Sequence, residues 1–254
     1  MPEPYYADNT VTLYHGDMRE VLPALGLQVD CVATDPPYGE TGLAWDRWPG
    51  GWPEVVAPVA SSMWCFGTLR MFAAHWVEFA AWRLSQDVVW RKHAGSRPAN
   101  DRFVRVHEQV THWYRGPWGD IYREVPRRSH HGPAKNWRPR RAAQAERSEH
   151  TGKYGPRGGY QDDGTRLMTS VLEADHRCQK ALHPTEKPIG VLHPLIEYAC
   201  PPGGTVLDPF AGSGATAEAA RLSGRRAVLV EADERYCEVA ARRLAQDVLP
   251  LGGR

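Results

Sequence analysis

The stretch Gly204-Thr-Val-Leu-Asp208-Pro-Phe-Ala-Gly-Ser-Gly214-Ala-Thr216 decides the fold of this chain. It is typical of a short apolar strand that passes through a glycine-rich turn into a helix. Glycines at such a turn let the backbone approach a ligand, and the unpaired N–H groups at the start of a helix bind polar or anionic groups. A second apolar run, Arg226 to Val230, is followed by Glu231. An acid at such a strand tip can bind both hydroxyls of a ribose.

Strands and helices are expected to alternate along most of the chain. The strands are expected near residues 11–15, 29–34, 62–66, 86–91, 107–114, 205–208 and 226–231. The helices are expected near residues 18–25, 53–61, 69–83, 188–199, 213–223 and 233–246. This alternation predicts an α/β fold with a mostly parallel sheet that is covered on both faces. Ligands of such a sheet lie at the carboxyl ends of its strands, where Asp17, Asp35, Asp208 and Glu231 fall.

A second informative stretch, Asp35-Pro36-Pro37-Tyr38, follows the hydrophobic run Val29 to Ala33. A planar exocyclic amine, such as adenine N6 or cytosine N4, has its lone pair delocalised into the ring and needs help to attack a methyl donor. Asp35 can accept one N–H of such an amine and the Pro36 carbonyl can accept the other. The two prolines fix the backbone and carry no competing donor. Tyr38 can stack on the base.

The glycine turn taken alone leaves two ligand classes open. Gly212-Ser-Gly214-Ala-Thr-Ala217 also fits the dinucleotide fingerprint, which would indicate NAD. Hydride transfer, however, requires neither the preceding Asp208-Pro-Phe-Ala211 nor the tetrapeptide at Asp35. The two stretches together therefore favour a methyl-donor site.

Together these stretches resemble the DNA amino-methyltransferases, which use S-adenosylmethionine and carry an Asp-Pro-Pro-Tyr catalytic motif and a Phe-x-Gly-x-Gly cofactor motif. The catalytic motif comes first here, which is the order of the circularly permuted β group. The resemblance implies a Rossmann-like methyltransferase fold, with a mostly parallel seven-stranded sheet, helices on both faces and an inserted target-recognition region. It also implies that strands 86–91 and 107–114 form an antiparallel edge.

The resemblance covers most of the chain and assigns roles residue by residue. Tyr14-His-Gly16-Asp17 resembles the acidic strand end near the cofactor adenine, His183 to Pro188 the segment at the methionine end of the donor, and Arg105 to Val110 a framework strand. The implied catalytic residues are Asp35, Pro36, Pro37 and Tyr38. The implied cofactor-binding residues are Asp17, Thr185, Lys187, Asp208, Phe210, Gly212, Ser213, Gly214 and Glu231.

Residues 115–182 have no match in the resemblance, and we expect them to be a target-recognition insert in a catalytic domain of residues 1–114 and 183–254. The chain carries a net charge of +1, but residues 115–160 hold eleven Lys and Arg against four Asp and Glu. Basic, aromatic-spaced irregular chain suits duplex DNA, and the alternative is a disordered, solvated loop. The two readings can coexist, since such a segment can become ordered only on DNA. The expected DNA-binding residues are Arg115, Arg123, Arg127, Arg128, Lys135, Arg138, Arg140 and Arg141.

The expected reaction begins with extrusion of the target base from double-stranded DNA, followed by direct methyl transfer without a covalent intermediate. Adenine N6 is favoured over cytosine N4, because similar enzymes that act on cytosine more often carry Ser at the position of Asp35. Methylation of a glutamine amide in a protein is disfavoured, because those enzymes usually show Asn-Pro-Pro-Tyr in unpermuted order. A catalytically silent DNA-binding module is disfavoured by the intact Asp35 and glycine turn.

Composition fits this reading, since 254 residues with 42% hydrophobic content can form one catalytic domain with an insertion. Five scattered cysteines without a Cys-x-x-Cys pair argue against zinc and disulfides, and His130-His131 is expected to be a solvated loop rather than a metal site. We expect no metal, no membrane span and a reducing compartment, the cytoplasm of a bacterial or phage-infected cell. A homodimer and a cognate restriction endonuclease remain open as partners.

The tryptophans divide into two groups. Gly39 to Trp52 contains Trp45, Trp48 and Trp52 among glycines, directly after the catalytic tetrapeptide, and is interpreted as a mobile flap over the target base. The alternative is a surface loop whose tryptophans pack on the domain. A second group is expected in the core, namely Trp64, Trp76, Trp82 and Trp90.

Overall fold

The computed structural model describes residues 2–96, 101, 103–129, 163–174 and 186–246. The chain divides into two compact units. One unit consists of Met1–Glu124 and Thr169–Arg254, and the other of Val125–Met168. The larger unit contains a nine-stranded sheet, and the smaller unit contains a two-stranded antiparallel sheet of β7 (Arg127–Ser129) and β8 (Thr165–Leu167).

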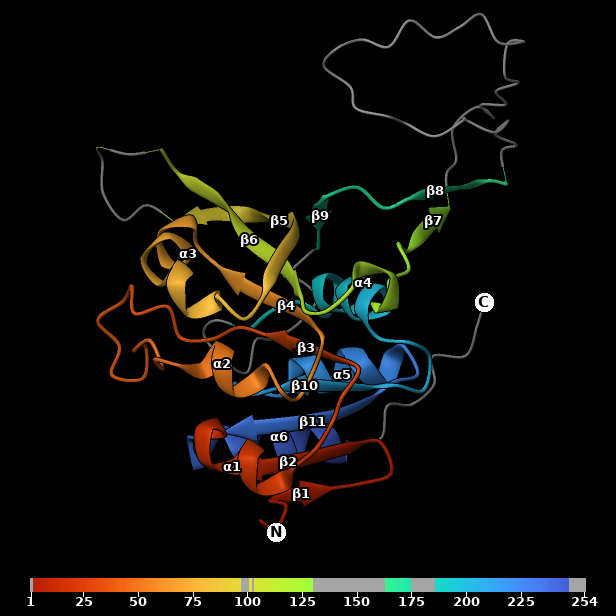
Figure 1. Ribbon diagram of the computed structural model, residues 1–254. Coiled ribbons are helices and arrows are strands. Elements are labelled where there is room, and N and C mark those ends of the chain that lie inside the picture. The colour runs from red at the N-terminus through yellow and green to blue at the C-terminus, as the bar shows by residue number, and fades with distance from the viewer. Residues whose placement is uncertain (1, 97–100, 102, 130–162, 175–185, 247–254) are drawn as a thin grey trace, which may run out of the picture. The chain divides into compact units, whose positions relative to one another are not determined.

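The strand order of the large sheet places two strands from the C-terminal part of the chain, β10 and β11, between two strands from its N-terminal part, β2 and β3 (Figure 1). The order is β1-β2-β11-β10-β3-β4-β6-β5-β9. The strands are β1 (Tyr6–Ala7), β2 (Val11–His15), β3 (Cys31–Thr34), β4 (Ser62–Gly67), β5 (Arg83–Ser96), β6 (Arg105–Tyr114), β9 (Val171–Glu173), β10 (Thr205–Asp208) and β11 (Arg226–Glu231). The neighbours from β2 to β4 are all parallel, so the carboxyl ends of β2, β11, β10, β3 and β4 share one edge.

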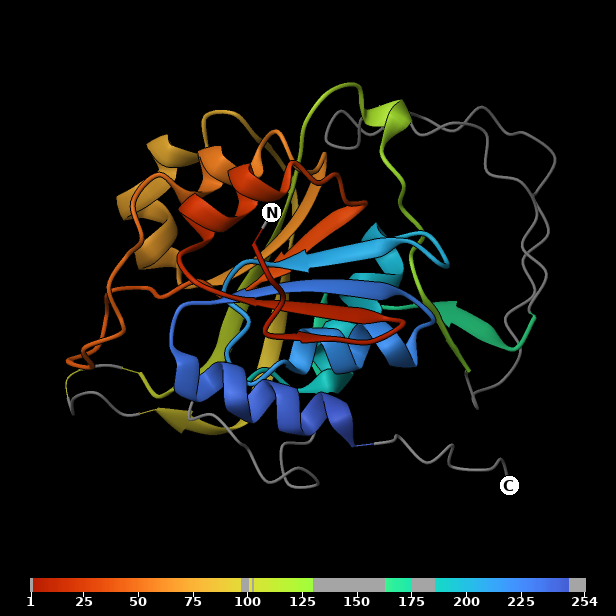
Figure 2. The same cartoon turned by 90° about the horizontal axis from the view of Figure 1, so that it is seen from below.

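Helices cover both faces of the sheet (Figure 2). One face carries α1 (Met18–Leu25), α2 (Trp52–Val56), α3 (Leu69–His75) and the 3-10 helix η1 (Trp76–Phe79). The other face carries α4 (Ile189–Ala199), α5 (Ala215–Leu222) and α6 (Glu234–Ala245). A further 3-10 helix, η2 (Trp118–Asp120), follows β6.

Local sequence signals explain where the helices around the glycine turn and β2 begin and end. Asp17 caps α1 by accepting the N–H of Arg19, and Gly26 ends this helix with a φ of 58°. Gly214 precedes α5 with a φ of 80°, and a Cβ on it would lie 3.2 Å from the Cβ of Ala240. Gly214 therefore permits both the turn and the close approach of α6.

The core on the first helical face is rich in large side chains. Trp52 of α2, Met63 of β4 and Phe79 of η1 are almost completely buried, and they pack with Val32 of β3. Trp52 and Phe79 meet edge to face, with ring centroids 5.8 Å apart. Burial of several aromatic side chains makes a large contribution to stability, and it holds β3 and β4 in fixed positions below the helices.

The α/β class and the mostly parallel sheet are confirmed, and each of the seven expected strands is present. The strand count was wrong, because β1 and β9 extend the sheet at its two edges. Strands of two and three residues show no period in sequence, and they exist only through pairing with a longer neighbour. The expected antiparallel pair forms between β5 and β6, but β9 lies outside β5 in parallel register, so this pair is not the edge.

Two further expectations need correction. The expected helix 69–83 is shorter, since α3 ends at His75 and gives way to η1. Trp76 was expected in the core but is 51% exposed, whereas Trp64, Trp82 and Trp90 are buried. A 3-10 helix turns more tightly than an α-helix, so the side chains after residue 75 face other directions than a continuous α-helix would give them. The helical pattern in the sequence does not show where such a break occurs.

Candidate active site

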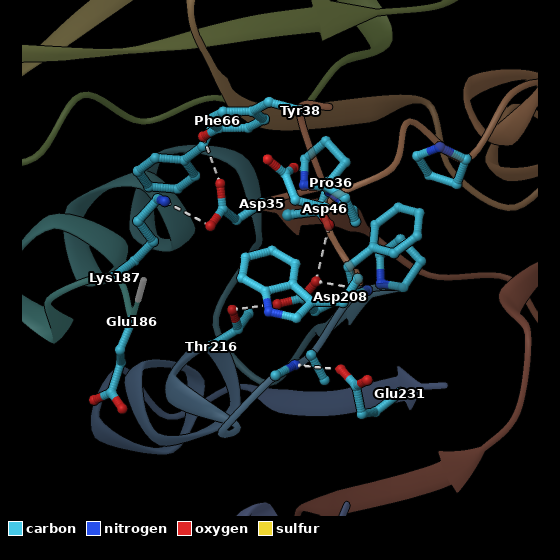
Figure 3. A pocket seen from close by; sticks show the side chains of 18 of the residues that line it. Asp35, Pro36, Tyr38, Asp46, Phe66, Glu186, Lys187, Asp208, Thr216 and Glu231 are labelled. Carbon is cyan, nitrogen blue, oxygen red and sulfur yellow. Dashed lines mark hydrogen bonds and ion pairs between the residues drawn. The ribbon is translucent and has the colours of Figure 1, made fainter. Parts of the chain in front are cut away.

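A cavity of about 740 Å³ lies at the shared edge formed by the carboxyl ends of the parallel strands (Figure 3). The structure brings most of the expected site residues to this one cavity. Those that line it are Asp17, Asp35, Pro36, Pro37, Tyr38, Lys187, Asp208, Phe210, Gly212, Ser213 and Glu231. Gly214 instead lies at the start of α5, and Thr185 lies outside the described residues.

At one end of the cavity, the carboxylate of Asp35 is held by two side chains. Lys187 Nζ donates to Asp35 Oδ2 at 2.5 Å, and the Tyr38 hydroxyl lies 2.5 Å from Asp35 Oδ1. The Lys187 ammonium also lies 5.3 Å from the ring centroid of Phe66 and 5.7 Å from that of Tyr38. The two rings and the ammonium thus lie around the Asp35 carboxylate, as Figure 3 shows.

Burial and neighbouring charges shift the pKa values of these groups. Burial raises the pKa of Asp35 above its usual value, the positive charge of Lys187 opposes this rise, and the negative charge of Glu108 adds to it. Burial alone would lower the pKa of Lys187, but Asp35 and Glu108 outweigh it and raise that pKa. Lys187 is therefore a stable cation, and Asp35 is a carboxylate that accepts a proton more readily than an exposed one.

Glu108 is a member of this cluster whose role the sequence interpretation missed. It lies on β6, opposite Trp90 of β5, and is 5% exposed. Its carboxylate lies 2.8 Å from Lys187 Nζ, 2.5 Å from Lys92 Nζ and 2.7 Å from the Tyr38 hydroxyl. The only signal in the sequence was an acid inside a strand, since a buried carboxylate requires partners.

At the other end of the cavity, the Glu231 carboxylate is held by the main chain. Its Oε2 accepts the N–H of Gly212 at 2.7 Å, and its Oε1 accepts the N–H of Asp233 at 2.8 Å. Each carboxylate oxygen has a second lone pair, so Glu231 can still accept from a ligand. Burial raises the pKa of Glu231. Gly212 has a φ of 50°, and a Cβ on it would meet no protein atom within 4 Å.

Between the two ends, Asp208 joins three parts of the framework. It is 3% exposed and accepts hydrogen bonds from the Thr34 hydroxyl at 2.9 Å, the Thr216 hydroxyl at 2.6 Å and the Phe210 N–H at 3.1 Å. Burial raises its pKa to about 6, although these donors oppose the shift. Asp208 therefore fixes the path of the chain from β10 into α5 beside the end of β3.

Three more of the expected cofactor residues have partners within the framework. The Ser213 hydroxyl donates to Glu186 at 2.7 Å, and Asp17 pairs with Arg19 at 2.5 Å. The ring of Phe210 meets that of Trp52 edge to face at 5.6 Å. These contacts hold the side chains in place at the cavity wall.

The segment after the tetrapeptide is held by side-chain hydrogen bonds. Asp46 is 6% exposed and accepts the N–H groups of Gly39, Glu40 and Thr41 at 2.7 to 3.1 Å. Trp48 stacks on the His75 ring at 4.0 Å, and Trp52 is completely buried. These contacts favour the alternative of a loop whose tryptophans pack on the domain over a loose flap.

The expected DNA-binding residues that the structure describes fall in both units. In the larger unit, Arg115 donates to the carbonyl of Ala57, and Arg123 lies over the Trp118 ring at 4.5 Å. In the smaller unit, Arg127 pairs with Asp163 at 3.1 Å, and Arg128 is exposed on β7. The remaining four lie outside the described residues, namely Lys135, Arg138, Arg140 and Arg141.

Among the residues that the structure describes, no three His, Cys, Asp or Glu side chains gather closely enough to hold a metal ion. His130-His131 lies outside them. None of the described helices is both long and apolar enough to cross a membrane.

The chain is similar to known methyltransferases over most of its length. The profile of the N6/N4 methyltransferase family, described as DNA methylase, matches residues 29–242. The Type II methyltransferase M.ScaI of Streptomyces caespitosus is 27% identical, with 98% of this chain and 86% of the relative aligned. The Type II methyltransferase M2.DpnII of Streptococcus pneumoniae is 23% identical, with 96% and 93% aligned.

Solved structures show the same fold at low sequence identity. The M1.HpyAVI–SAM complex has a TM-score of 0.62 at 22% identity and covers 92% of this chain and 99% of its own. The cytosine-N4-specific PvuII DNA methyltransferase has a TM-score of 0.63 at 15% identity and covers 98% of this chain and 91% of its own.

Proposed function

The chain belongs to the DNA methylase family and uses S-adenosylmethionine as its methyl donor, and from this premise we propose that its target is the N6 amine of adenine in duplex DNA. The observation that carries the proposal is Asp35-Pro36-Pro37-Tyr38, which directly follows β3 and lines the same cavity as the glycine turn. Resembling enzymes that act on cytosine more often carry Ser at the position of Asp35.

The residues at the glycine-turn end of the cavity, around Gly212 and Glu231, fit S-adenosylmethionine. Glu231 has lone pairs for ribose hydroxyls, Gly212 leaves open space beside the backbone, and Asp17 lies at the end of β2 on the same edge. We assign the hold on the donor to these residues together with Ser213 and Phe210. S-adenosylmethionine supplies a methyl group made electrophilic by a positively charged sulfur.

The other end of the cavity, around Asp35 and Pro36, is its acceptor end, and it binds and activates the target amine. Asp35 accepts one N–H and the Pro36 carbonyl accepts the other, which returns electron density to the nitrogen. Positive charge develops on that nitrogen during the reaction, and a fixed carboxylate stabilises it without reorganisation. The raised pKa of Asp35 also suits it to take the proton that the amine releases. Tyr38 offers a ring face to the extruded base.

The choice of base is tested by product analysis. The purified protein is incubated with duplex DNA and labelled S-adenosylmethionine, and the DNA is digested to nucleosides for mass spectrometry. We expect N6-methyladenine. N4-methylcytosine as the main product would overturn the adenine assignment and keep the amine chemistry, which the fold likeness to a cytosine-N4 enzyme makes the natural second outcome.

Sequence recognition is assigned to residues 115–182, on the basis of their basic charge. Arg128→Ala is a test within the described part, because this side chain is exposed on β7. If Arg128 contacts a phosphate, the variant should bind all duplexes more weakly and lower the salt slope of binding by about one. If it contacts a guanine edge, the loss should be about 1 to 3 kcal/mol at one position of the site. An unchanged salt slope and unchanged sequence preference would remove Arg128 from the interface.

The two Type II relatives support a restriction–modification setting with a cognate restriction endonuclease. Sequencing of host DNA with modification-sensitive reads, after expression of the protein, would report the methylated base and its sequence context together. A single repeated short site is the expected outcome.

A further inference from the structure

Glu108 is a buried acid that no step of the proposed chemistry uses directly. It is 5% exposed, yet its carboxylate contacts two ammonium groups and a hydroxyl. Three separate parts of the chain supply these groups: Lys92 comes from β5, Lys187 from the segment before α4, and Tyr38 from the loop after β3. The pairing of β6 with its neighbouring strands does not require these three contacts, so Glu108 has a role beyond that of a strand residue.

The cluster is balanced in charge. Two carboxylates, Asp35 and Glu108, face two ammonium groups, Lys187 and Lys92, at distances of 2.5 to 2.8 Å. Removal of one partner from a buried pair leaves a charge without compensation. Lys187 bridges the two carboxylates, so the position of its ammonium on Asp35 depends on Glu108 as the second anchor.

The Tyr38 hydroxyl makes the second link between the two acids. It lies 2.5 Å from Asp35 Oδ1 and 2.7 Å from Glu108 Oε1, but it has only one proton to donate. When a target amine donates to Asp35, the hydroxyl can keep a hydrogen bond by donating to Glu108. Without Glu108, the hydroxyl and the amine would compete for the same carboxylate oxygen.

We propose that Glu108 is a positioning residue for Asp35. It holds the Lys187 ammonium against Asp35 Oδ2 and accepts the Tyr38 hydroxyl, so that Asp35 Oδ1 is available to the target amine. This role rests on the proposed function, because it assumes that Asp35 accepts the amine. It does not depend on whether the amine belongs to adenine or cytosine.

The charges of the cluster predict in which direction the pKa of Asp35 moves when one of its neighbours is replaced. The charged and titratable groups that face Asp35 are Lys187, Glu108 and Tyr38, with Asp208 of β10 and the thiol of Cys65 on β4 nearby. Burial would raise the pKa of Glu108, but Lys187 and Lys92 outweigh it and lower that pKa to about 2, so Glu108 stays negative. Loss of this negative charge should lower the pKa of Asp35, and loss of the Lys187 charge should raise it.

The experiment compares Glu108→Gln, Glu108→Ala and Lys187→Met with the wild type, and uses Glu238→Gln as a matched control. Glu238 of α6 also pairs with a cation, Arg242, but it is exposed, lies outside the cavity and is not part of residues 115–182. Turnover and KM for S-adenosylmethionine are measured from about pH 5 to 9, and the pKa of Asp35 is measured by carbon-13 NMR of aspartate-labelled protein without DNA.

We expect Glu108→Gln to lower kcat about tenfold and Glu108→Ala about a hundredfold, with KM for the donor changed less than about threefold. Gln keeps an acceptor for Tyr38, which explains its smaller effect. The acid limb of kcat and the NMR pKa of Asp35 should move to lower pH in both variants and to higher pH in Lys187→Met. Glu238→Gln should match the wild type.

Turnover of Glu108→Gln and Glu108→Ala within about twofold of wild type at every pH, with an unmoved Asp35 pKa, would overturn the proposal. If Glu108→Gln fails to fold, the charge-balanced double variant Glu108→Gln with Lys92→Met replaces it and is judged by the same two readouts. A wild-type protein that methylates no DNA would overturn the proposed function instead, and the NMR titration would still decide whether Glu108 sets the pKa of Asp35.

Discussion

Asp35, at one end of the cavity, is held by the side chains of Lys187 and Tyr38, whereas Glu231, at the other end, is held by the backbone N–H groups of Gly212 and Asp233. Side-chain partners can exchange when a ligand arrives, and their charges set the pKa of the acid between them. Backbone donors are fixed by the turn itself. The first end therefore suits a step in which charge changes, and the second suits the binding of a constant ligand.

The largest effect on activity is expected when Asp35 is replaced. Asp35→Ala should lower turnover about a thousandfold, because it removes the acceptor on which the amine depends. Affinity for S-adenosylmethionine, measured by calorimetry, should change less than about threefold, since the donor is assigned to the other end. Turnover above about a tenth of wild type would contradict the acceptor role.

Gly212→Val should have the next largest effect, on donor binding rather than on chemistry. The φ of 50° strains a branched residue, and its side chain would project into open cavity space. We expect affinity for S-adenosylmethionine to fall more than about tenfold. Gly212→Ala is the matched control and should lie between wild type and Val. Equal affinity in all three proteins would place the donor elsewhere.

Glu231→Ala should weaken donor binding by about 1 to 3 kcal/mol through the loss of a charge-assisted hydrogen bond. The variant also leaves the N–H groups of Gly212 and Asp233 without their acceptor. Glu231→Gln separates the two causes, because it keeps one acceptor oxygen and removes the charge. Calorimetric affinities of both variants equal to wild type would exclude Glu231 from the donor site.

The smallest effect on activity is expected at Asp208, which lies between the ends and contacts the framework. Burial raises its pKa from 3.8 to about 6, so the folded protein binds more protons than the unfolded chain between about pH 4 and 6. The stability from this group is present below pH 4 and is lost as pH rises through 6. Asp208→Asn should flatten this fall, which is at most about 3 kcal/mol, in denaturant unfolding from pH 4 to 7. An equal slope in both proteins would contradict the raised pKa.

The sequence predicted the glycine-turn end better than the acceptor end, for a physical reason. Gly212, Gly214 and Glu231 follow from one local pattern, in which a strand, a turn and a helix are consecutive in the chain. The cluster around Asp35 depends instead on the pairing of β4 with β6 and of β6 with β5, which places Glu108 and Lys92 at the same edge. Strand pairing over such separations leaves no period or motif in the sequence.

The contacts of Lys187 differ from the role that the resemblance implied for it. It was assigned to the donor, and it does line the cavity, but its ammonium lies 2.5 Å from Asp35. The segment it belongs to reaches both ends of the site, because Glu186, the residue before it, accepts from Ser213 of the glycine turn. The resemblance placed Glu186 and Lys187 together in the segment at the methionine end of the donor. In the structure Lys187 contacts Asp35, whereas Glu186 contacts Ser213.

The position of β10 between β3 and β11 has a consequence for the synthesis of the protein. β3 ends at Thr34, but its partner β10 begins only at Thr205 and leaves the ribosome roughly 10 to 30 s later at typical elongation rates. During that interval the apolar edge of β3 has β4 as a neighbour on one side only. The nascent chain therefore carries an open strand edge that chaperones can bind, and truncated products should be prone to aggregation rather than partly active.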